Sequence, residues 1–205
     1  TLAGARFVPA PTPARDAFQL RATTVEALVT ERTRVLILNY PCNPTGTSYT
    51  RAELANIASF ARRRNLVVLS DEIYDELTYD RPHVALPSLP SMKERTLYLN
   101  GFSKGYAMTG WRIGYAGGPE ALITAMAKLG SNFHSCTPAF VQLAADEARL
   151  RPTKQPQVLF RAQSAPMQSL AEKTDLEADV VSRRFLVVDF PEDGRLQLRG
   201  HPLVG

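Results

Sequence analysis

The chain has 205 residues, of which 44% are hydrophobic, so it can bury one sizeable core. Its formal net charge of +4 comes from 24 basic and 20 acidic residues scattered along the sequence, without the basic stripe that nucleic-acid binding requires. Two distant cysteines and three dispersed histidines argue against a disulfide framework and a metal site. No apolar run is long enough to cross a bilayer and the start does not resemble a signal peptide, so we expect a cytoplasmic protein.

Short apolar runs alternate with amphipathic stretches over the first 150 residues, as a parallel α/β sheet requires. Strands are predicted at residues 35–38, 66–69, 96–99 and 113–116. Helices are predicted at residues 51–64, 119–129 and 138–150, with a polar connection at 130–137. Thr50 is the expected N-cap of the first helix and Glu53 its capping-box partner. This alternation predicts an α/β fold.

The remainder of the chain has a different composition. Residues 151–170 contain several prolines among glutamines and serines, which predicts a loop or tether. Residues 184–189 predict a strand, and residues 192–194 a turn into a second apolar run at 195–198. We therefore expect two parts, 1–150 and a divergent segment at 151–205.

Three polar segments begin where predicted strands end. Open α/β sheets bind ligands in the crevice at the carboxyl ends of their strands. Asn43, Asp71 and Lys104 each follow a predicted strand by a few residues, so one crevice can gather them if the strands are neighbours. The sequence alone leaves that adjacency open.

Lys104 is the most informative of these residues. It follows an apolar run, with Ser103 before it and Arg112 eight residues later, an arrangement suited to holding a phosphorylated aldehyde covalently. That chemistry points to pyridoxal phosphate. On residue type alone, the alternative is a surface lysine on a loop and an arginine that begins a strand.

Taken in order, three segments resemble the fold-type I aminotransferases of the aspartate aminotransferase superfamily, class I/II: NYPCNPTG at 39–46, SDEIY at 70–74 and GFSKGYAMTGWRIG at 101–114. The resemblance covers about residues 1–150. It implies a three-layer α/β/α fold with a mainly parallel sheet, of which residues 1–150 form part of the cofactor-binding large domain. Members of this family are considerably longer, and residues 151–205 do not match their small domain.

The resemblance also implies roles for the acid and base groups. Lys104 would form a Schiff base with the aldehyde of pyridoxal 5'-phosphate and then move a proton between the substrate α-carbon and the cofactor. Asp71, rather than its neighbour Glu72, would lie against the pyridine nitrogen and keep the ring electron-withdrawing. A carboxylate that caps a following helix is the alternative for Asp71.

The remaining cofactor contacts follow from the same resemblance. Tyr74, three residues after Asp71 on the first turn of a helix, would bind the phenolic oxygen together with Asn43. Arg112 would bind the phosphate with both arms of its guanidinium, and Ser103 would add a hydroxyl. A buried structural tyrosine is the alternative for Tyr74. The peptide bond after Asn43, to Pro44, is often cis in the family.

The implied activity is transfer of an amino group between an amino acid and a 2-oxo acid, in a homodimer. Elimination by a related lyase, or the chemistry of an aminocyclopropane-carboxylate synthase, would use the same segments. A regulatory domain that senses the cofactor and an inactive fragment are further alternatives. The first of these two would accompany a DNA-binding helix-turn-helix, and no such pattern with a basic recognition face occurs in the sequence.

Overall fold

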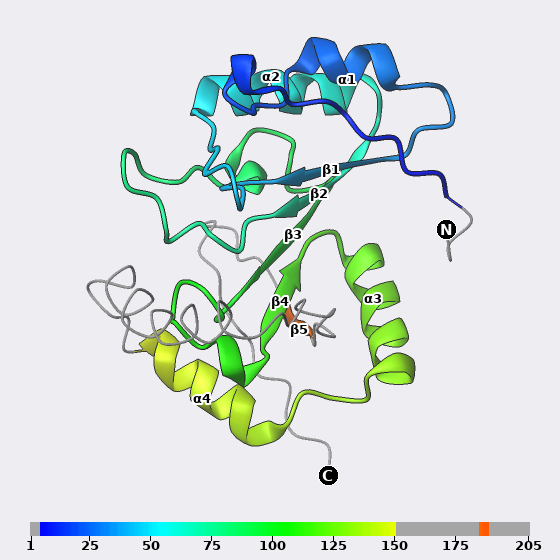
Figure 1. Cartoon of the computed structure of the whole chain (residues 1–205). Helices are drawn as coiled ribbons and strands as arrows, with labels where there is room; N and C mark the ends of the chain where they lie inside the picture. Colours follow the sequence, from blue (N-terminus) through cyan, green and yellow to red (C-terminus); the bar gives the residue numbers. More distant parts are fainter. Residues whose placement is uncertain (1–4, 151–184, 189–205) are drawn as a thin grey trace, which may run out of the picture.

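The computed structural model describes residues 5–150 and the strand at 185–188, and within them a five-stranded sheet forms the centre of the molecule (Figure 1). The strands, adjacent in the order of the sequence, are β1 (Val35–Asn39), β2 (Val67–Asp71), β3 (Thr96–Gly101), β4 (Gly114–Gly117) and β5 (Phe185–Val188). β1, β2 and β3 are parallel, β4 is antiparallel to β3, and β5 is parallel to β4. The predicted α/β class with a mainly parallel sheet is confirmed.

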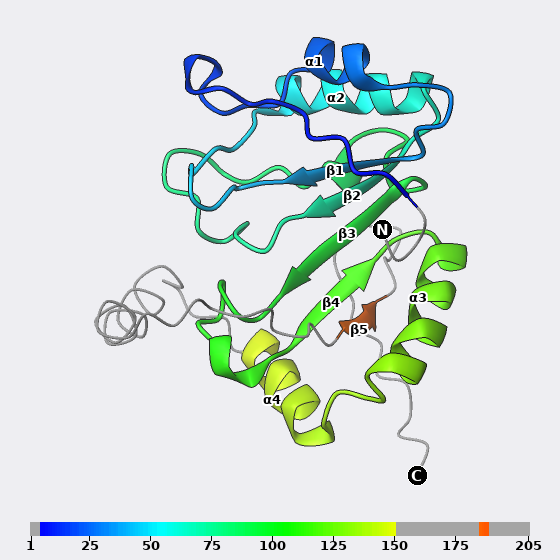
Figure 2. The same cartoon turned by 45° about the vertical axis from the view of Figure 1, so that its right-hand side comes forward.

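Four helices accompany the sheet in the described part of the chain: α1 (Ala22–Leu28), α2 (Arg51–Arg63), α3 (Glu120–Phe133) and α4 (Ala139–Leu150). In both views α1 and α2 lie side by side next to β1, and α3 and α4 lie next to β4 and β5 (Figures 1 and 2). None of the helices described is long and apolar enough to span a membrane.

Helix α2 begins where its sequence predicts. The Thr50 backbone N–H donates to Glu53 Oε2 at 2.7 Å, and the Glu53 N–H donates to Thr50 Oγ1 at 3.3 Å, which completes the capping box. Three arginines, at 62, 63 and 64, lie at the other end, where cations interact favourably with the helix dipole. Both ends of α2 therefore follow from local chemistry.

The main core lies between α2 and one face of the sheet. Leu54, Ile57 and Phe60 of α2 pack against Leu36 and Leu38 of β1, and all five are buried. The alternate residues of β1 point to the other face, where Val35 is 51% exposed and Ile37 52% exposed. The period-2 alternation of β1 thus separates its two faces.

The prediction for residues 130–137 is wrong in its first half, because α3 continues to Phe133. Ser131 and Asn132, the polar residues that suggested a connection, belong to the last turn of the helix. Ser131 Oγ and Asn132 Nδ2 both donate to the carbonyl oxygen of Lys128, at 3.0 and 2.8 Å. Helical hydrogen bonding persists until the His134 N–H, which donates to the Gly130 carbonyl at 2.8 Å.

The predicted strand at 184–189 corresponds to β5. The predictions of a tether at 151–170 and of a turn at 192–194 leading into 195–198 lie outside the described residues.

Candidate active site

The carboxyl ends of β1, β2 and β3 are neighbours. Asn39 is paired with Asp71, and Asp71 with Leu99, in the register of the sheet. The pairing continues past the strands, since the Tyr40 N–H donates to the Asp71 carbonyl at 3.1 Å and the Glu72 N–H to the Leu99 carbonyl at 2.9 Å. The adjacency that the sequence left open therefore holds.

The loops that follow these three strands bring Asn43, Tyr74 and Lys104 together. Asn43 Nδ2 donates to Tyr74 Oη at 3.0 Å. Lys104 Nζ lies 5.3 Å from the centre of the Tyr74 ring, within the range of a cation–π interaction. An amide, a phenol and an amine from three separate loops thus form one polar cluster.

A tight loop after β1 holds Asn43. The Cys42 N–H donates to the Thr47 carbonyl at 2.9 Å, and the Gly46 N–H donates to the Cys42 carbonyl at 2.7 Å. Gly46 has φ +70°, a conformation that favours glycine. The bond from Asn43 to Pro44 is cis, as the resemblance implies.

Tyr74 lies in consecutive turns, and the helical turn predicted there does not form. The Asp75 N–H donates to the Glu72 carbonyl at 3.0 Å, and the Leu77 N–H donates to the Tyr74 carbonyl at 2.9 Å. Both bonds span three residues, as in β-turns, and the chain then continues as a loop. No helix directly follows Asp71.

Lys104 lies in a loop that closes on itself. The Phe102 N–H donates to the Ile113 carbonyl at 3.3 Å, the Met108 N–H to the Phe102 carbonyl at 3.2 Å, and the Ala107 N–H to the Lys104 carbonyl at 3.1 Å. These bonds fix the backbone of Lys104 in the loop that follows β3.

Ser103 and Arg112 flank the end of the β3–β4 pairing. The antiparallel register ends at Gly101, paired with Gly114, and the Phe102 N–H donates to the Ile113 carbonyl, so Ser103 and Arg112 are the next residues of the two segments. Arg112 has φ +54° and is exposed, and its Nη1 donates to the Thr109 carbonyl at 2.5 Å. Arg112 is thus placed beside the Lys104 loop, with one guanidinium nitrogen bound to its own turn.

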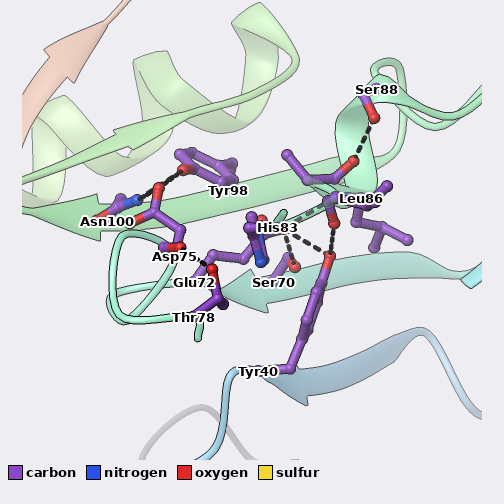
Figure 3. Close-up of polar contacts among 12 residues, drawn as sticks. Tyr40, Ser70, Glu72, Asp75, Thr78, His83, Leu86, Ser88, Tyr98 and Asn100 are labelled. Atoms are coloured by element: carbon purple, nitrogen blue, oxygen red, sulfur yellow. Dashed lines mark hydrogen bonds and ion pairs between the residues drawn. The ribbon is translucent and has the colours of Figure 1, made fainter. Parts of the chain in front are cut away.

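The Glu72 side chain is completely buried and lies in a different group of residues from this cluster (Figure 3). Its carboxylate is bound by Tyr40 Oη at 3.1 Å, Ser70 Oγ at 2.6 Å, the Leu86 N–H at 3.1 Å and His83 Nε2 at 2.5 Å. Burial, reinforced by the nearby charge of Glu72, raises the pKa of Tyr40 above its usual value. This carboxylate belongs to the core, whereas Asp71, the last residue of β2, is half-buried.

A second carboxylate, that of half-buried Asp75, was not identified from the sequence. Asn100 Nδ2 donates to Asp75 Oδ2 at 2.7 Å, and Tyr98 Oη donates to the same oxygen at 3.3 Å (Figure 3). Burial raises the pKa of Asp75 to about 6. Its position directly after Tyr74 was the only available signal, because its partners lie more than twenty residues further along the chain.

The mainly parallel α/β sheet thus carries an asparagine, a tyrosine and a lysine in the loops that follow β1, β2 and β3. The profile of the family described as "Aminotransferase class I and II" matches residues 1–166. The chain belongs to this family.

Individual relatives agree with the family. The chain is 46% identical over 147 residues to the putative aminotransferase YugH of Bacillus subtilis (strain 168), covering 72% of this chain and 38% of that protein. It is 43% identical over 148 residues to an aspartate aminotransferase of Pyrococcus abyssi, again over 72% of this chain and 38% of the relative. The solved aromatic aminotransferase of Pyrococcus horikoshii OT3 superposes with a TM-score of 0.73 at 38% identity, over 84% of this chain and 47% of that one.

The chain therefore spans about 38% of the length of the curated relatives that it matches. Its fold is that of the fold-type I transferases, as expected from the three segments.

Proposed function

We propose that the protein is a pyridoxal-phosphate-dependent aminotransferase, or the part of one that carries the cofactor-binding residues. The observation that supports this most strongly is the cluster of Asn43, Tyr74 and Lys104 on adjacent strand ends. The named aminotransferases among the relatives support the same activity.

The donor set fits the cofactor. The amine of Lys104, the phenol of Tyr74 and the amide of Asn43 come together from three loops, and Asp71 is the last residue of β2. These groups match an aldehyde, a phenolic oxygen and a pyridine nitrogen. When bound, pyridoxal phosphate withdraws electrons from a substrate α-carbon. The residues of the chain attach, orient and polarise that group.

Each residue has a distinct task in this proposal. Lys104 Nζ would hold the aldehyde and would carry a proton to and from the substrate α-carbon. The Asp71 carboxylate would keep the pyridine nitrogen protonated. Asn43 Nδ2 and Tyr74 Oη, which lie 3.0 Å apart, would bind the phenolic oxygen. Arg112 and Ser103, just beyond the β3–β4 pairing, would bind the phosphate.

The proposal extends to partners and organisation. The substrates are an amino acid and a 2-oxo acid, the assembly is a homodimer, and the compartment is the cytoplasm, as the family resemblance implies. Residues 1–150 serve as part of the cofactor domain, and 151–205 as a divergent segment.

Absorbance spectroscopy tests the attachment of the cofactor. The purified chain is titrated with pyridoxal phosphate beside Lys104→Ala and a control, Lys128→Ala, which removes an exposed lysine from α3. We expect a protein-dependent band in the wild type and the control that Lys104→Ala lacks. The same spectrum from all three proteins would reject Lys104 as the attachment point. A panel of amino acids with product analysis then separates amino transfer from elimination, and conversion by none would identify an inactive fragment.

A further inference from the structure

The turn that carries Tyr74 is joined to the loop that carries Lys104 by a hydrogen-bonded link. Asp75 Oδ2 accepts from Asn100 Nδ2 at 2.7 Å, and Asn100 Oδ1 accepts from the Gly101 N–H at 2.7 Å. Asp75 directly follows Tyr74, and Gly101 begins the segment that leads to Lys104. The Asn100 amide therefore connects the two backbones that position these side chains.

Packing brings the same two segments into contact. A Cβ built on Gly105 would meet Glu76 Cγ at 3.0 Å, and one built on Gly101 would meet Ile73 Cδ1 at 3.3 Å. Residues on both sides of Tyr74 thus pack against glycines on both sides of Lys104. Because the two segments are closely packed, a change in the link would shift both Tyr74 and Lys104.

The Asp75 carboxylate is surrounded by donors. Tyr98 Oη donates to Oδ2 at 3.3 Å and the Glu76 N–H donates to Oδ1 at 2.8 Å, in addition to the bond from Asn100. Tyr98 Oη itself accepts from Asn100 Nδ2 at 2.6 Å. Because Asn100 Oδ1 already binds Gly101, the Asn100 amide can offer only its N–H groups. A carboxylic acid can keep these contacts, because its own proton can be donated to Tyr98 Oη while its oxygens accept from Asn100 and from the Glu76 N–H. Ionisation instead leaves a charge in a half-buried position.

We propose that Asp75 is a positioning residue that holds the Tyr74 turn against the Lys104 loop while protonated, and that its ionisation weakens this link and the affinity for pyridoxal phosphate. This inference rests on the proposed function, and it adds regulation of that site by pH. Asp75 itself does not touch the cofactor.

The surroundings of Asp75 place its titration near neutrality. Burial and then the negative charge of Glu76 raise its pKa to about 6, against the opposing effects of His83 and of the Asn100 hydrogen bond. The other titratable groups that sense Asp75 are tyrosines of β3, β4 and the Lys104 loop: Tyr98, Tyr115 and Tyr106. Burial is the main cause of the raised pKa of each phenol, so these phenols remain neutral while Asp75 titrates.

The first measurement uses the cofactor-free protein. The side-chain amide of Asn100 and the backbone amide of Gly101 are followed by nitrogen-15 NMR between pH 5 and 8. The midpoint of their chemical-shift change should lie at the pKa of Asp75, about 6. We expect both signals to titrate in the wild type and in the control Asp80→Asn, which alters an exposed carboxylate in the same segment. Neither signal should titrate in Asp75→Asn. An Asn100 amide that does not respond to pH in the wild type would overturn the proposed link.

The second measurement is cofactor affinity. Between pH 5 and 7.5, the dissociation constant for pyridoxal phosphate should rise about threefold to tenfold more in the wild type and in Asp80→Asn than in Asp75→Asn, the effect of one hydrogen bond. Ionisation of the cofactor itself changes the affinity of all three proteins equally, so the difference from Asp75→Asn reports the effect of Asp75 alone. Identical profiles in all three proteins would overturn the regulatory role. Failure of every protein to bind at any pH would reject the proposed function and the cofactor role of Asp75, while the amide titration would still decide on the link.

Discussion

Replacement of Glu72 by alanine tests the most heavily bonded carboxylate of the described structure. Glu72 is completely buried and accepts from Tyr40, Ser70, Leu86 and His83. Alanine removes every acceptor at once. We expect a large loss of stability because the donors remain buried without water.

The magnitude follows from the donors that lose their only acceptor in the described structure. Tyr40 Oη retains the Val84 carbonyl at 3.0 Å, so it remains bound. No second acceptor is described for the other three donors, which are Ser70 Oγ, the Leu86 N–H and His83 Nε2. Each buried donor without a partner costs about 1–3 kcal/mol. Even at the lower bound the sum is about 3 kcal/mol, in the range of about 3–5 kcal/mol found when one partner of a buried ion pair is removed. A loss of this size is a large fraction of the stability of a typical domain.

Urea unfolding followed by circular dichroism at pH 7.5 measures this loss. Glu72→Gln retains one carbonyl oxygen for the hydroxyls and the Leu86 N–H, so its loss should be smaller than that of Glu72→Ala. Glu26→Ala, at an exposed position of α1, should lie within about 0.5 kcal/mol of the wild type. A Glu72→Ala loss below about 1 kcal/mol, or an equal loss for alanine and glutamine, would refute the hydrogen-bond argument.

Three further changes test other parts of the fold. Thr50→Ala removes the N-cap of α2 and should lower the free energy of unfolding by about 1 kcal/mol in the same urea assay. Gly101→Ala places a Cβ 2.9 Å from the backbone of Gly114 and should cost about 1–3 kcal/mol, whereas Gly110→Ala, with open space around its Cβ, is the control. The pKa of Asp75 is raised from 3.8 to about 6, so its contribution to stability is present below pH 4 and is lost as the pH rises through 6. Unfolding free energies at several pH values should therefore show Asp75→Asn gaining on the wild type between pH 4 and 7, and a constant difference would contradict the raised pKa.

The sequence predicted the elements whose signals are local. The capping box of α2 needs only Thr50 and Glu53, which lie three residues apart, and both of its hydrogen bonds form. The gathering of Asn43 and Lys104 could be anticipated because parallel strands end at one edge of a sheet. By contrast, the end of α3 was misplaced because Ser131 and Asn132 are typical of connections when read alone, yet here both bond to a carbonyl of the preceding turn.

The Asp75 link could not be predicted, because its partner Asn100 lies 25 residues away on another strand. A carboxylate in a turn is ordinarily solvated. The fold places half-buried Asp75 against Tyr98 and Asn100, which are both buried.

The alternation of β2 explains why Asp71 and Glu72 have different environments. Along this strand Val68 and Ser70 are buried while Val67, Leu69 and Asp71 are half-buried, and Glu72 continues the buried series. Successive side chains of a strand point to opposite faces, so fixing Glu72 in its core network directs Asp71 to the other side. Exchange of the two residues would put a shorter carboxylate among the donors of the core and a longer one at the strand end, although the composition would be unchanged. The position of the acid proposed to bind the cofactor thus depends on the register of β2, which the buried bonds of Glu72 hold in place.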